Sequence, residues 1–312
     1  MDKLDKIFLK IQWPQKRKFQ LVGMGLNAVD WICSLPHYPH HNSKVEIEGL
    51  HKVGGGQVAT ASALCARYGM KVRYIGRVGD DEIGEFSLNS LGQESMDISC
   101  VQVVPGATSQ FAIILVDRPS GERTILWDRD SKLIYQEGEL KREWIVEGQL
   151  LHLDGHDQKA AIQAAKWAKE AGMRVSLDID KVQPGVEELL GLTDFLMPTE
   201  SFVQSFSDEK DWKKGLKIVA KLGSLLVGVT RGKHGAAVLW EGEIFEIPGI
   251  QVTALDTTGA GDVFHGALLY GILQGQNLDY CLRLANVAAA LSCTRIGARG
   301  GIPQLEKVLE IF

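Results

Sequence analysis

Asp256-Thr-Thr-Gly-Ala-Gly-Asp-Val-Phe-His-Gly-Ala-Leu268 is the stretch from which this chain is best understood. It predicts a turn of small residues that opens an amphipathic helix, with Thr257 and Thr258 capping the helix start. The first backbone N–H groups of a helix have no partner within it, and the helix dipole adds partial positive charge there. The stretch therefore predicts a place that suits a phosphate group.

One carboxylate, Asp262, falls in the first turn of this predicted helix, where it would repel a phosphate. A carboxylate beside an anion site can take a proton from a hydroxyl while the amides of Gly259, Ala260 and Gly261 hold the phosphoryl group. That is the geometry of a small-molecule kinase. The simpler interpretation is a tight turn followed by an Asp that complements the helix dipole. The pattern by itself leaves both interpretations open.

The composition narrows the class of protein. The 312 residues are 45% hydrophobic and 23% charged, which allows a sizeable core in one large domain or two smaller ones. A net charge of −5 argues against a nucleic-acid partner. No apolar run approaches the roughly 18–20 residues of a membrane helix, and the first residues lack the apolar core of a signal peptide. Five cysteines, an odd number without a CxxC pair, predict reduced thiols in a cytoplasmic protein.

Strand-like and helix-like patterns alternate along most of the chain. Strands are predicted at residues 19–25, 72–75, 150–153, 174–177, 194–197 and 225–229. Helices are predicted at residues 58–68, 159–171, 208–222 and 278–293. This alternation predicts an α/β fold of three layers, a mostly parallel sheet with helices on both faces. Residues 1–18 are interpreted as an N-terminal extension of a domain that spans residues 19–312.

Two stretches, about residues 31–53 and 100–128, break this alternation. They contain strand-like pieces such as Phe111–Val116 and a turn at Arg118–Gly121, with no helix between them. They predict a small separate β-layer. A plain antiparallel extension of the main sheet is the alternative.

The opening motif, extended to Leu269, resembles residue for residue the C-terminal motif of the ribokinase-like (PfkB) family of carbohydrate and nucleoside kinases. The resemblance covers about residues 20–305. It implies a ribokinase-like fold in which the small β-layer is a lid over the sugar site, shared in a homodimer. It implies Asp262 as catalytic base, the amides of residues 259–261 as the anion hole, and ATP with Mg²⁺ as the phosphoryl donor.

Polar residues follow the first predicted strand, at the carboxyl end where open α/β sheets usually bind ligands. Asn27 and Asp30 lie there, and their side chains can hydrogen-bond to sugar hydroxyls. An Asn and an Asp after a strand are also common turn formers. The stretch resembles the first substrate loop of the family, which implies a substrate role for Asp30 first and for Asn27 second.

A glycine-rich stretch, Val53–Thr60, opens the first predicted helix without the Gly-Lys-Ser/Thr of a P-loop. It resembles the N-terminal Gly-Gly motif of the family, which implies that Gly55, Gly56 and Thr60 lie against the sugar. Ribokinases have Lys where this chain has Gln57, and many members have Asn at the position of Thr60. This form is similar to the fructokinase, ketohexokinase and sulfofructose kinase side of the family, which favours a ketose.

Asp154 follows the strand predicted at residues 150–153, where several family members place an acidic sugar ligand. An N-cap for the helix at residues 159–171 is the alternative. Arg129 and Lys132, beyond the lid strand, instead suit an anionic substrate. The sequence leaves open whether the substrate is neutral or charged.

The predicted nucleotide end begins at residues 229–235, which join a strand to the apolar run 236–240. A plain hairpin turn is the alternative interpretation of this segment. The nucleotide contacts that the resemblance implies are Thr230, Gly232, Gly235, Thr258 and Asn286.

Two further segments resemble cation-binding parts of the family. Met197-Pro-Thr-Glu200 occupies the position of a Pro-Asn-Glu motif, and the resemblance implies that Glu200 acts on Mg²⁺ through water. Residues 294–301 resemble a loop that binds a monovalent cation, which implies a K⁺ site. The implied members of the K⁺ site are Asp256, Thr258, Arg295 and Gly297.

The sequence therefore predicts an ATP-dependent kinase of a small sugar, with a ketose favoured and with no nucleic-acid or membrane partner. One alternative is a nucleoside kinase of the same family, which would need aromatic side chains around a base in the lid. The other alternative is a non-catalytic sugar sensor on the same fold. The retention of Asp262 together with Gly-Ala-Gly argues against the sensor, because a protein that only binds has no use for a base.

Overall fold

The main sheet of the computed structural model, which describes residues 3–312, has eight strands in the order β14-β13-β12-β11-β10-β9-β1-β4. Their bounds are β1 Phe19–Met24, β4 Val72–Ile75, β9 Gly148–Asp154, β10 Arg174–Asp178, β11 Phe195–Leu196, β12 Leu226–Thr230, β13 Ala236–Trp240 and β14 Glu243–Ile247. The strands from β4 to β12 are parallel, and β13 and β14 continue the sheet antiparallel. All six predicted strands are present, with ends that differ by one or two residues.

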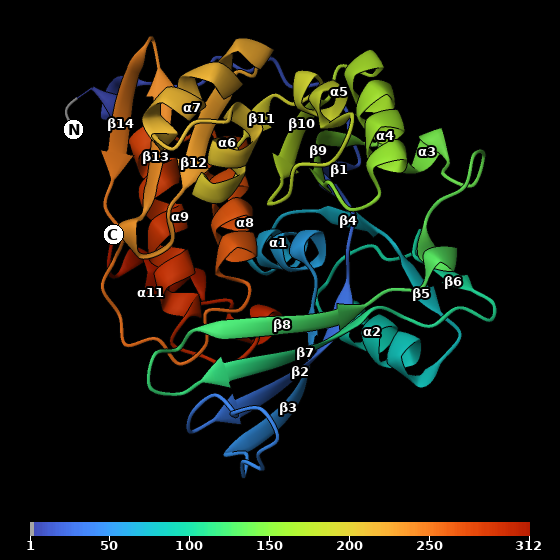
Figure 1. The fold of residues 1–312 in the computed structure, drawn as a ribbon. Coiled ribbons are helices and arrows are strands. Elements are labelled where there is room, and N and C mark those ends of the chain that lie inside the picture. Colours follow the sequence, from blue (N-terminus) through green and yellow to red (C-terminus); the bar gives the residue numbers. More distant parts are fainter. Residues whose placement is uncertain (1–2) are drawn as a thin grey trace.

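Helices cover both faces of this sheet (Figure 1). One face carries α1 Gln57–Arg67, α8 Ala260–Leu273 and α9 Leu278–Ser292, and the other carries α4 Gln158–Glu170, α5 Val186–Gly191, α6 Glu200–Ser207 and α7 Trp212–Val219. Successive strand residues alternate between the two cores. Leu21 of β1 packs in the first and Val22 in the second, as the period of a strand requires. The three-layer α/β/α fold predicted from the sequence is thus confirmed.

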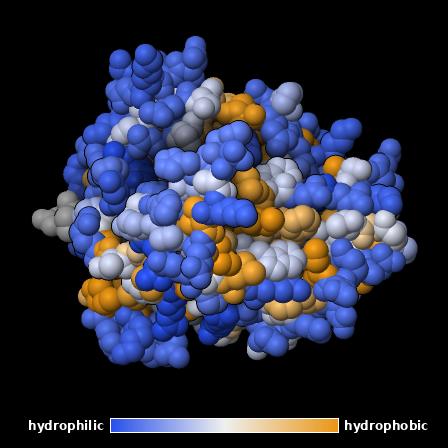
Figure 2. Space-filling model, turned by 60° about the horizontal axis from the view of Figure 1, so that its bottom comes forward, coloured by the Kyte–Doolittle hydropathy of each residue, from blue (hydrophilic) through white to orange (hydrophobic). Residues whose placement is uncertain are grey.

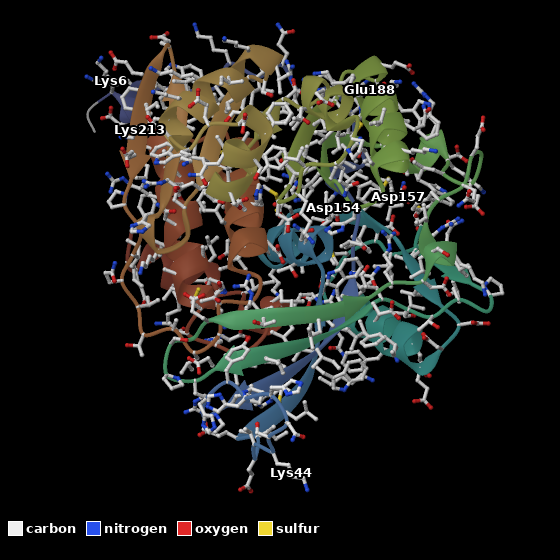
Figure 3. All side chains as sticks on the ribbon, viewed as in Figure 1. Lys6, Lys44, Asp154, Asp157, Glu188 and Lys213 are labelled. Atoms are coloured by element: carbon white, nitrogen blue, oxygen red, sulfur yellow. The ribbon has the colours of Figure 1, made fainter. Side chains whose placement is uncertain are left out.

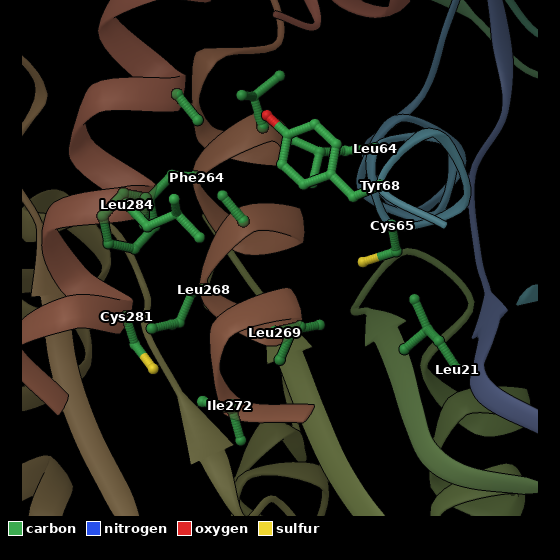
Figure 4. Close-up of a cluster of buried hydrophobic side chains, with 14 of the residues drawn as sticks. Leu21, Leu64, Cys65, Tyr68, Phe264, Leu268, Leu269, Ile272, Cys281 and Leu284 are labelled. Carbon is green, nitrogen blue, oxygen red and sulfur yellow. The ribbon is translucent and has the colours of Figure 1, made fainter. Parts of the chain in front are cut away.

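The core beneath α1, α8 and α9 fixes where α8 begins. Leu64, Tyr68, Phe264 and Leu268 interdigitate there (Figure 4). Gly266 lets α8 approach α1 closely, because a Cβ at this position would lie 2.8 Å from the carbonyl oxygen of Ala61. The packing therefore holds the first turn of α8 in a defined place at the edge of the sheet.

A second, four-stranded sheet lies apart from the main one, below the carboxyl ends of its strands in Figure 1. Its strands are β2 Ala28–Leu35, β3 Gly49–Gly55, β7 Phe111–Asp117 and β8 Arg123–Asp128, in the order β3-β2-β7-β8. The alternative expectation, an extension of the main sheet, is wrong. Residues 102–104 form β6, which pairs with β5 Arg77–Gly79 in a sheet of two strands, so the four-stranded sheet uses only the later part of segment 100–128. We call the four-stranded sheet the lid.

The lid has one face toward the main sheet and one face away from it. Ile32, Ala112 and Ile114 form a small buried cluster on the inner face. Ile113 and Leu126 pair across the outer face and are 42% and 54% exposed. Figure 2, with the lower side of the molecule turned forward, shows apolar side chains gathered in a band across this side.

The prediction of a helix at residues 208–222 is wrong in its limits. Helix α6 ends at Ser207, and Asp208 takes a left-handed conformation with φ 54°. Helix α7 begins only at Trp212, after Asp211 accepts a hydrogen bond from the amide of Lys213. The predicted helix therefore began four residues too early, because two Asp residues that favour turns and caps separate α7 from α6, a helix that was not predicted.

The remaining helices are short connections or lie outside the three layers: α2 Glu82–Gly92, α3 Arg142–Ile145, α10 Ala298–Gly301 and α11 Leu305–Leu309. The segment before β1 packs on the same chain, because Leu4 is buried and the carbonyl of Ile7 accepts the amide of Leu278 at 2.8 Å. Within residues 3–312, no helix has the length and apolar character needed to cross a membrane.

Candidate active site

The candidate site lies where the parallel strands end and the lid begins. Asp154 ends β9 and Asp178 ends β10, and the two are register partners on neighbouring strands. Figure 3 shows Asp154 in the space between the large sheet and the lid. The lid contacts the opposite wall through Arg123, whose guanidinium donates to Thr257 Oγ1 at 2.7 Å. The β7–β8 hairpin thus reaches the start of α8.

Helix α8 begins differently from the expectation. Its N-cap is Gly259, with φ 79° and no side-chain cap hydrogen bond, so the prediction that Thr257 and Thr258 cap the helix is wrong. The hydroxyl of Thr257 instead donates to the carbonyl of Gly121 in the lid hairpin, at 3.3 Å. The hydroxyl of Thr258 is buried and has no hydrogen-bond partner in residues 3–312. A glycine cap leaves the first amides of the helix uncovered by a side chain.

Three backbone amides at this start have no acceptor in the described chain: those of Gly259, Gly261 and Asp262. The amide of Ala260 donates to the carbonyl of Thr257 at 3.3 Å. The space beside Gly261 is open, because a Cβ there would meet no atom within 4 Å. The cradle predicted from residues 259–261 is therefore present, with the amide of Asp262 as a further member and that of Ala260 partly occupied.

The carboxyl of Asp262 stands at the edge of this cradle and is only half-buried. Desolvation raises its pKa to about 7, and the negative charge of Asp178 adds to the rise. The charges of His265 and Arg123 act in the opposite direction, while that of Asp30 adds a small further rise. A general base works best when its pKa lies near the operating pH, and Asp262 meets this condition.

A buried ion pair lies beneath Asp262 and was not predicted from the sequence. His265, one helical turn further along α8, places Nε2 at 3.3 Å from Oδ1 of Asp178. Burial opposes the charge on each partner, but their mutual attraction raises the pKa of His265 and lowers that of Asp178. His152 stacks 5.8 Å from the His265 ring, and burial lowers its pKa to about 3, so it stays neutral. His265 follows Asp262 by three residues in the sequence, and this spacing was the signal from which its place near Asp262 could have been predicted.

The glycines before α1 make room for charged side chains of the protein itself. A Cβ on Gly55 would overlap the carboxyl of Asp30, and a Cβ on Gly54 would overlap the guanidinium of Arg299. Gly56 has φ 96°, which favours glycine. Asp30 is 5% exposed, and burial raises its pKa to about 7 despite the charge of Arg299. Asp30 thus faces the inside of the lid without a side-chain hydrogen bond in residues 3–312.

Asn27 and Thr60, two predicted substrate contacts, are buried. The amide of Asn27 donates to Tyr74 Oη at 3.0 Å and accepts from Ser87 Oγ at 2.7 Å. These bonds hold the loop after β1 and take up most of the side chain's capacity. Thr60 lies within α1, fully buried, and its hydroxyl has no partner in the described chain.

Asp154 is buried and holds the backbone around it. Its two oxygens accept the amides of Leu26 at 2.7 Å and of His156 at 3.1 Å. The alternative that Asp154 caps the next helix is wrong, because the N-cap of α4 is Asp157. Burial raises the pKa of Asp154. Asp154 is the last residue of β9, and its role as a sugar ligand stays a prediction.

Four of the five predicted nucleotide residues lie near strands β12–β14, while Thr258 lies at the start of α8. Thr230 ends β12, and its amide donates to the carbonyl of Pro198 at 2.9 Å. Gly232 and Gly235 form a tight turn with φ 53° and 88°. The backbone of this segment therefore has the shape of the hairpin turn that was the alternative interpretation. The amide nitrogen of Asn286 donates to two carbonyls at the end of β14, so this side chain anchors the chain there.

The residues present limit how Mg²⁺ could be held. No group of three or more Cys, His, Asp or Glu side chains in residues 3–312 is placed to hold a metal ion. Mg²⁺ in kinases keeps waters and binds mainly through phosphate oxygens, so this arrangement fits. Glu200, at the start of α6, pairs with Arg231 at 2.8 Å through one oxygen and keeps its other oxygen for water.

Asp256 connects the cradle to the loop before α10. Its carboxylate accepts the amides of Thr258 at 2.9 Å and Gly297 at 2.8 Å. The unpartnered hydroxyl of Thr258 lies beside it, while the side chain of Arg295 is exposed. Asp256, Thr258 and Gly297 thus come together as predicted, and Arg295 could join them only through its backbone.

Comparisons with known proteins agree with this geometry. The model of the pfkB family of carbohydrate kinases matches residues 24–305. Ribokinase of Lactococcus lactis is 30% identical over 290 residues, covering 91% of this chain and 94% of the relative. A presumptive ribokinase from Agrobacterium tumefaciens superposes with a TM-score of 0.87 and 27% identity, covering 94% of this chain and 97% of its own. Arabidopsis thaliana ribokinase, in complex with ribose and ATP, shares the fold with a TM-score of 0.81 and 24% identity, covering 94% and 98%.

Proposed function

Because this chain belongs to the pfkB family of carbohydrate kinases, we propose that it transfers the γ-phosphoryl group of ATP to a hydroxyl of a monosaccharide, with a ketose favoured. The observation that carries the proposal is the start of α8. There, three unpaired amides form an anion cradle beside a half-buried carboxyl whose pKa lies at about 7. An anion cradle and a base in one helical turn serve phosphoryl transfer to a hydroxyl.

In the proposed step, Asp262 accepts the proton of the substrate hydroxyl while that oxygen bonds to the γ-phosphorus. The bond between the γ-phosphorus and the bridging oxygen breaks, and ADP carries away the electron pair. The amides of Gly259, Gly261 and Asp262 donate to the oxygens of the transferring group. Mg²⁺, when bound, neutralises charge on the phosphates, and Glu200 would hold it through water. The contact of Arg123 with Thr257 holds the β7–β8 hairpin of the lid against the start of α8.

The lining of the substrate end favours a sugar over a nucleoside. The hollow there is lined by Met24, Gly25, Leu26, Asn27, Gly76, Arg77, Gln110, Arg129, Leu133, Tyr135, Asp154 and Asp157. Only one of these side chains is aromatic, whereas several carry charges or amides that suit hydroxyl groups. A base would need stacking partners that this lining lacks.

An ADP-release assay with ATP, Mg²⁺ and K⁺ tests the proposal across ketoses, aldoses, sugar phosphates, sugar acids and nucleosides. We expect turnover of at least one sugar. Turnover of nucleosides alone would contradict the sugar substrate and support the alternative, a nucleoside kinase. Calorimetric binding of a sugar without any turnover would instead indicate a sensor.

We also propose that K⁺ binds next to Asp256 and stiffens the anion cradle. The support is that one carboxylate joins Thr258 and Gly297, so a cation among the neighbouring carbonyls would act directly on the cradle. Replacing K⁺ by tetramethylammonium at constant ionic strength is expected to lower kcat several-fold. An unchanged kcat would show that the site is absent or unused.

The outer face of the lid supports the proposal of a homodimer formed through the lid. Leu50, Ile113 and Leu126 lie on it and are 58%, 42% and 54% exposed. Such a face is best covered by the same face of a second copy, which two-fold symmetry allows. Leu126→Glu is expected to shift the sedimentation coefficient to that of a monomer. Lys44→Glu, in the loop between β2 and β3, is the control, and a monomeric wild-type protein would contradict the proposal.

A further inference from the structure

The hollow at the substrate end contains a cation that has no ion-pair partner within 4 Å in residues 3–312. The hollow lies at the carboxyl ends of β1 and β9 and is partly open to solvent. Arg129, in the connection after β8, is half-buried and lines this hollow. Its guanidinium makes no ion pair within 4 Å and no hydrogen bond with residues 3–312. A partly buried charge without a partner is costly unless a ligand supplies one.

The other charged groups of the hollow are already committed. The guanidinium of Arg77 pairs with Glu139 at 2.7 Å and lies over the ring of Tyr135. The two oxygens of Asp154 accept backbone amides. Asp157 accepts the amide of Tyr135 at 2.8 Å. These carboxylates are therefore hydrogen-bonded to the protein, and neither forms an ion pair with Arg129 within 4 Å, although the charge of Arg129 acts on Asp154 and opposes the rise of its pKa.

Two neutral polar groups in the same hollow also have no partner. The hydroxyl of Tyr135 and the side-chain oxygen of Gln110 are buried without a hydrogen bond in the described chain. Burial raises the pKa of Tyr135, so its hydroxyl stays protonated and can donate. Gln110 can accept from a hydroxyl. Buried groups of this kind usually have a partner, and here the partner can be a ligand.

We propose that the substrate is an acidic sugar, whose carboxylate, phosphate or sulfonate is bound by Arg129 and Tyr135 while Gln110 accepts one of its hydroxyls. This proposal rests on the proposed kinase function. The hollow adjoins Asp154 at the end of β9, one strand away from Asp178, whose charge acts on Asp262. Neighbouring strands are about 4.8 Å apart, so a short sugar chain can reach from the anionic group to the base.

Lys132 is not part of this site, although the sequence placed it beside Arg129 as a candidate for an anionic substrate. Its ammonium donates to the carbonyl of Gly106 at 2.6 Å on the exposed surface, and it does not line the hollow. Lys132→Gln therefore changes the same charge outside the site. It is the matched control for Arg129→Gln.

The test compares neutral sugars with anionic counterparts: glucose with its C1-oxidised acid gluconate, fructose with fructose 6-phosphate, and ribose with ribose 5-phosphate. The full-length chain is assayed for ADP release and, in parallel, for binding by calorimetry. We expect an acidic member to be preferred over its neutral counterpart. Arg129→Gln is expected to raise KM for that acid by roughly 10²-fold, since the loss of one partner of a charge pair has an effect of this size. Lys132→Gln and the rate with the neutral sugar should change little.

Preference for the neutral member of every pair would overturn the proposal, and so would equal losses for both members in Arg129→Gln. If no sugar is turned over, the proposed kinase function is contradicted. Calorimetric binding of the acids then still tests the proposed anion site at Arg129. Binding of an acid that Arg129→Gln abolishes would uphold the site. Failure of all three acids to bind would overturn it.

Discussion

Replacing Asp262 by asparagine is expected to lower kcat by roughly 10²–10⁴-fold, the range that a general base contributes. The amide of Asn cannot take the hydroxyl proton, but it occupies the same volume at the edge of the cradle. The backbone amides that hold the phosphoryl group would stay in place, because packing of α8 against α1 and α9 fixes them. Single-turnover rates, with calorimetric dissociation constants for ATP and the sugar, would separate the loss of chemistry from the loss of binding.

The matched control is Asp208→Asn, a change at the left-handed residue between α6 and α7, where Asn is tolerated. Its kcat should equal that of the wild-type protein. If Asp262→Asn retained the wild-type rate, the assignment of Asp262 as the base would be wrong. If it lost ATP binding to the same extent as rate, Asp262 would act on binding rather than on proton transfer.

His265→Asn is expected to move the rise of activity with pH toward higher pH by about one unit, which corresponds to roughly 1.4 kcal/mol. Asp262 acts as a base only when it is ionised, so activity rises as pH passes through its pKa of about 7. The positive charge of His265 lowers that pKa, and Asp178 raises it. Without His265, the charge of Asp178 is no longer neutralised, and the pKa of Asp262 should rise. At pH 7 the ionised fraction would fall from about one half to about one tenth, so the rate would fall about fivefold and recover at higher pH.

A double variant gives this prediction its control. Asp178→Asn together with His265→Asn removes both charges of the pair, so the pH profile should return close to that of the wild-type protein. Arg123, Asp30, His152 and His156, which also act on Asp262 or Asp178, are unchanged in both variants. A rate loss in His265→Asn that does not recover at high pH would show a packing role instead. Urea unfolding would report the cost of burying Asp178 alone, about 3–5 kcal/mol.

The sequence predicted the layers of this fold well, because their signals are local. Strands β1, β4, β9 and β12 appear as short apolar runs, and glycines end the predicted helices at residues 58–68 and 159–171. The family membership and the kinase class that the opening motif predicted are confirmed. The substrate preference, the catalytic assignment and the dimer stay predictions.

The errors came where local signals compete. The helix predicted at residues 208–222 begins only at Trp212, because Asp208 ends α6 and Asp211 caps α7, and both residues have the propensity for turns and caps. The start of α8 was assigned a Thr cap because Thr is a favoured cap residue, whereas Gly259 performs this role by its conformation. Asp154 was a cap candidate by its distance from α4, but the loop between them contains Asp157.

What the sequence by itself determined is the chemistry that one short segment can carry: an anion cradle and a carboxylate within a single helical turn at residues 259–262. What only the tertiary structure decided is the environment of that segment. Asp178, His265 and Arg123 come from β10, α8 and the lid, and together they set the pKa of Asp262. Arg129, which has no ion-pair partner within 4 Å, likewise lines the hollow only when folding brings the connection after β8 next to the end of β9. Charges act over distances in space and respond to burial, and neither quantity can be obtained from spacing along a chain.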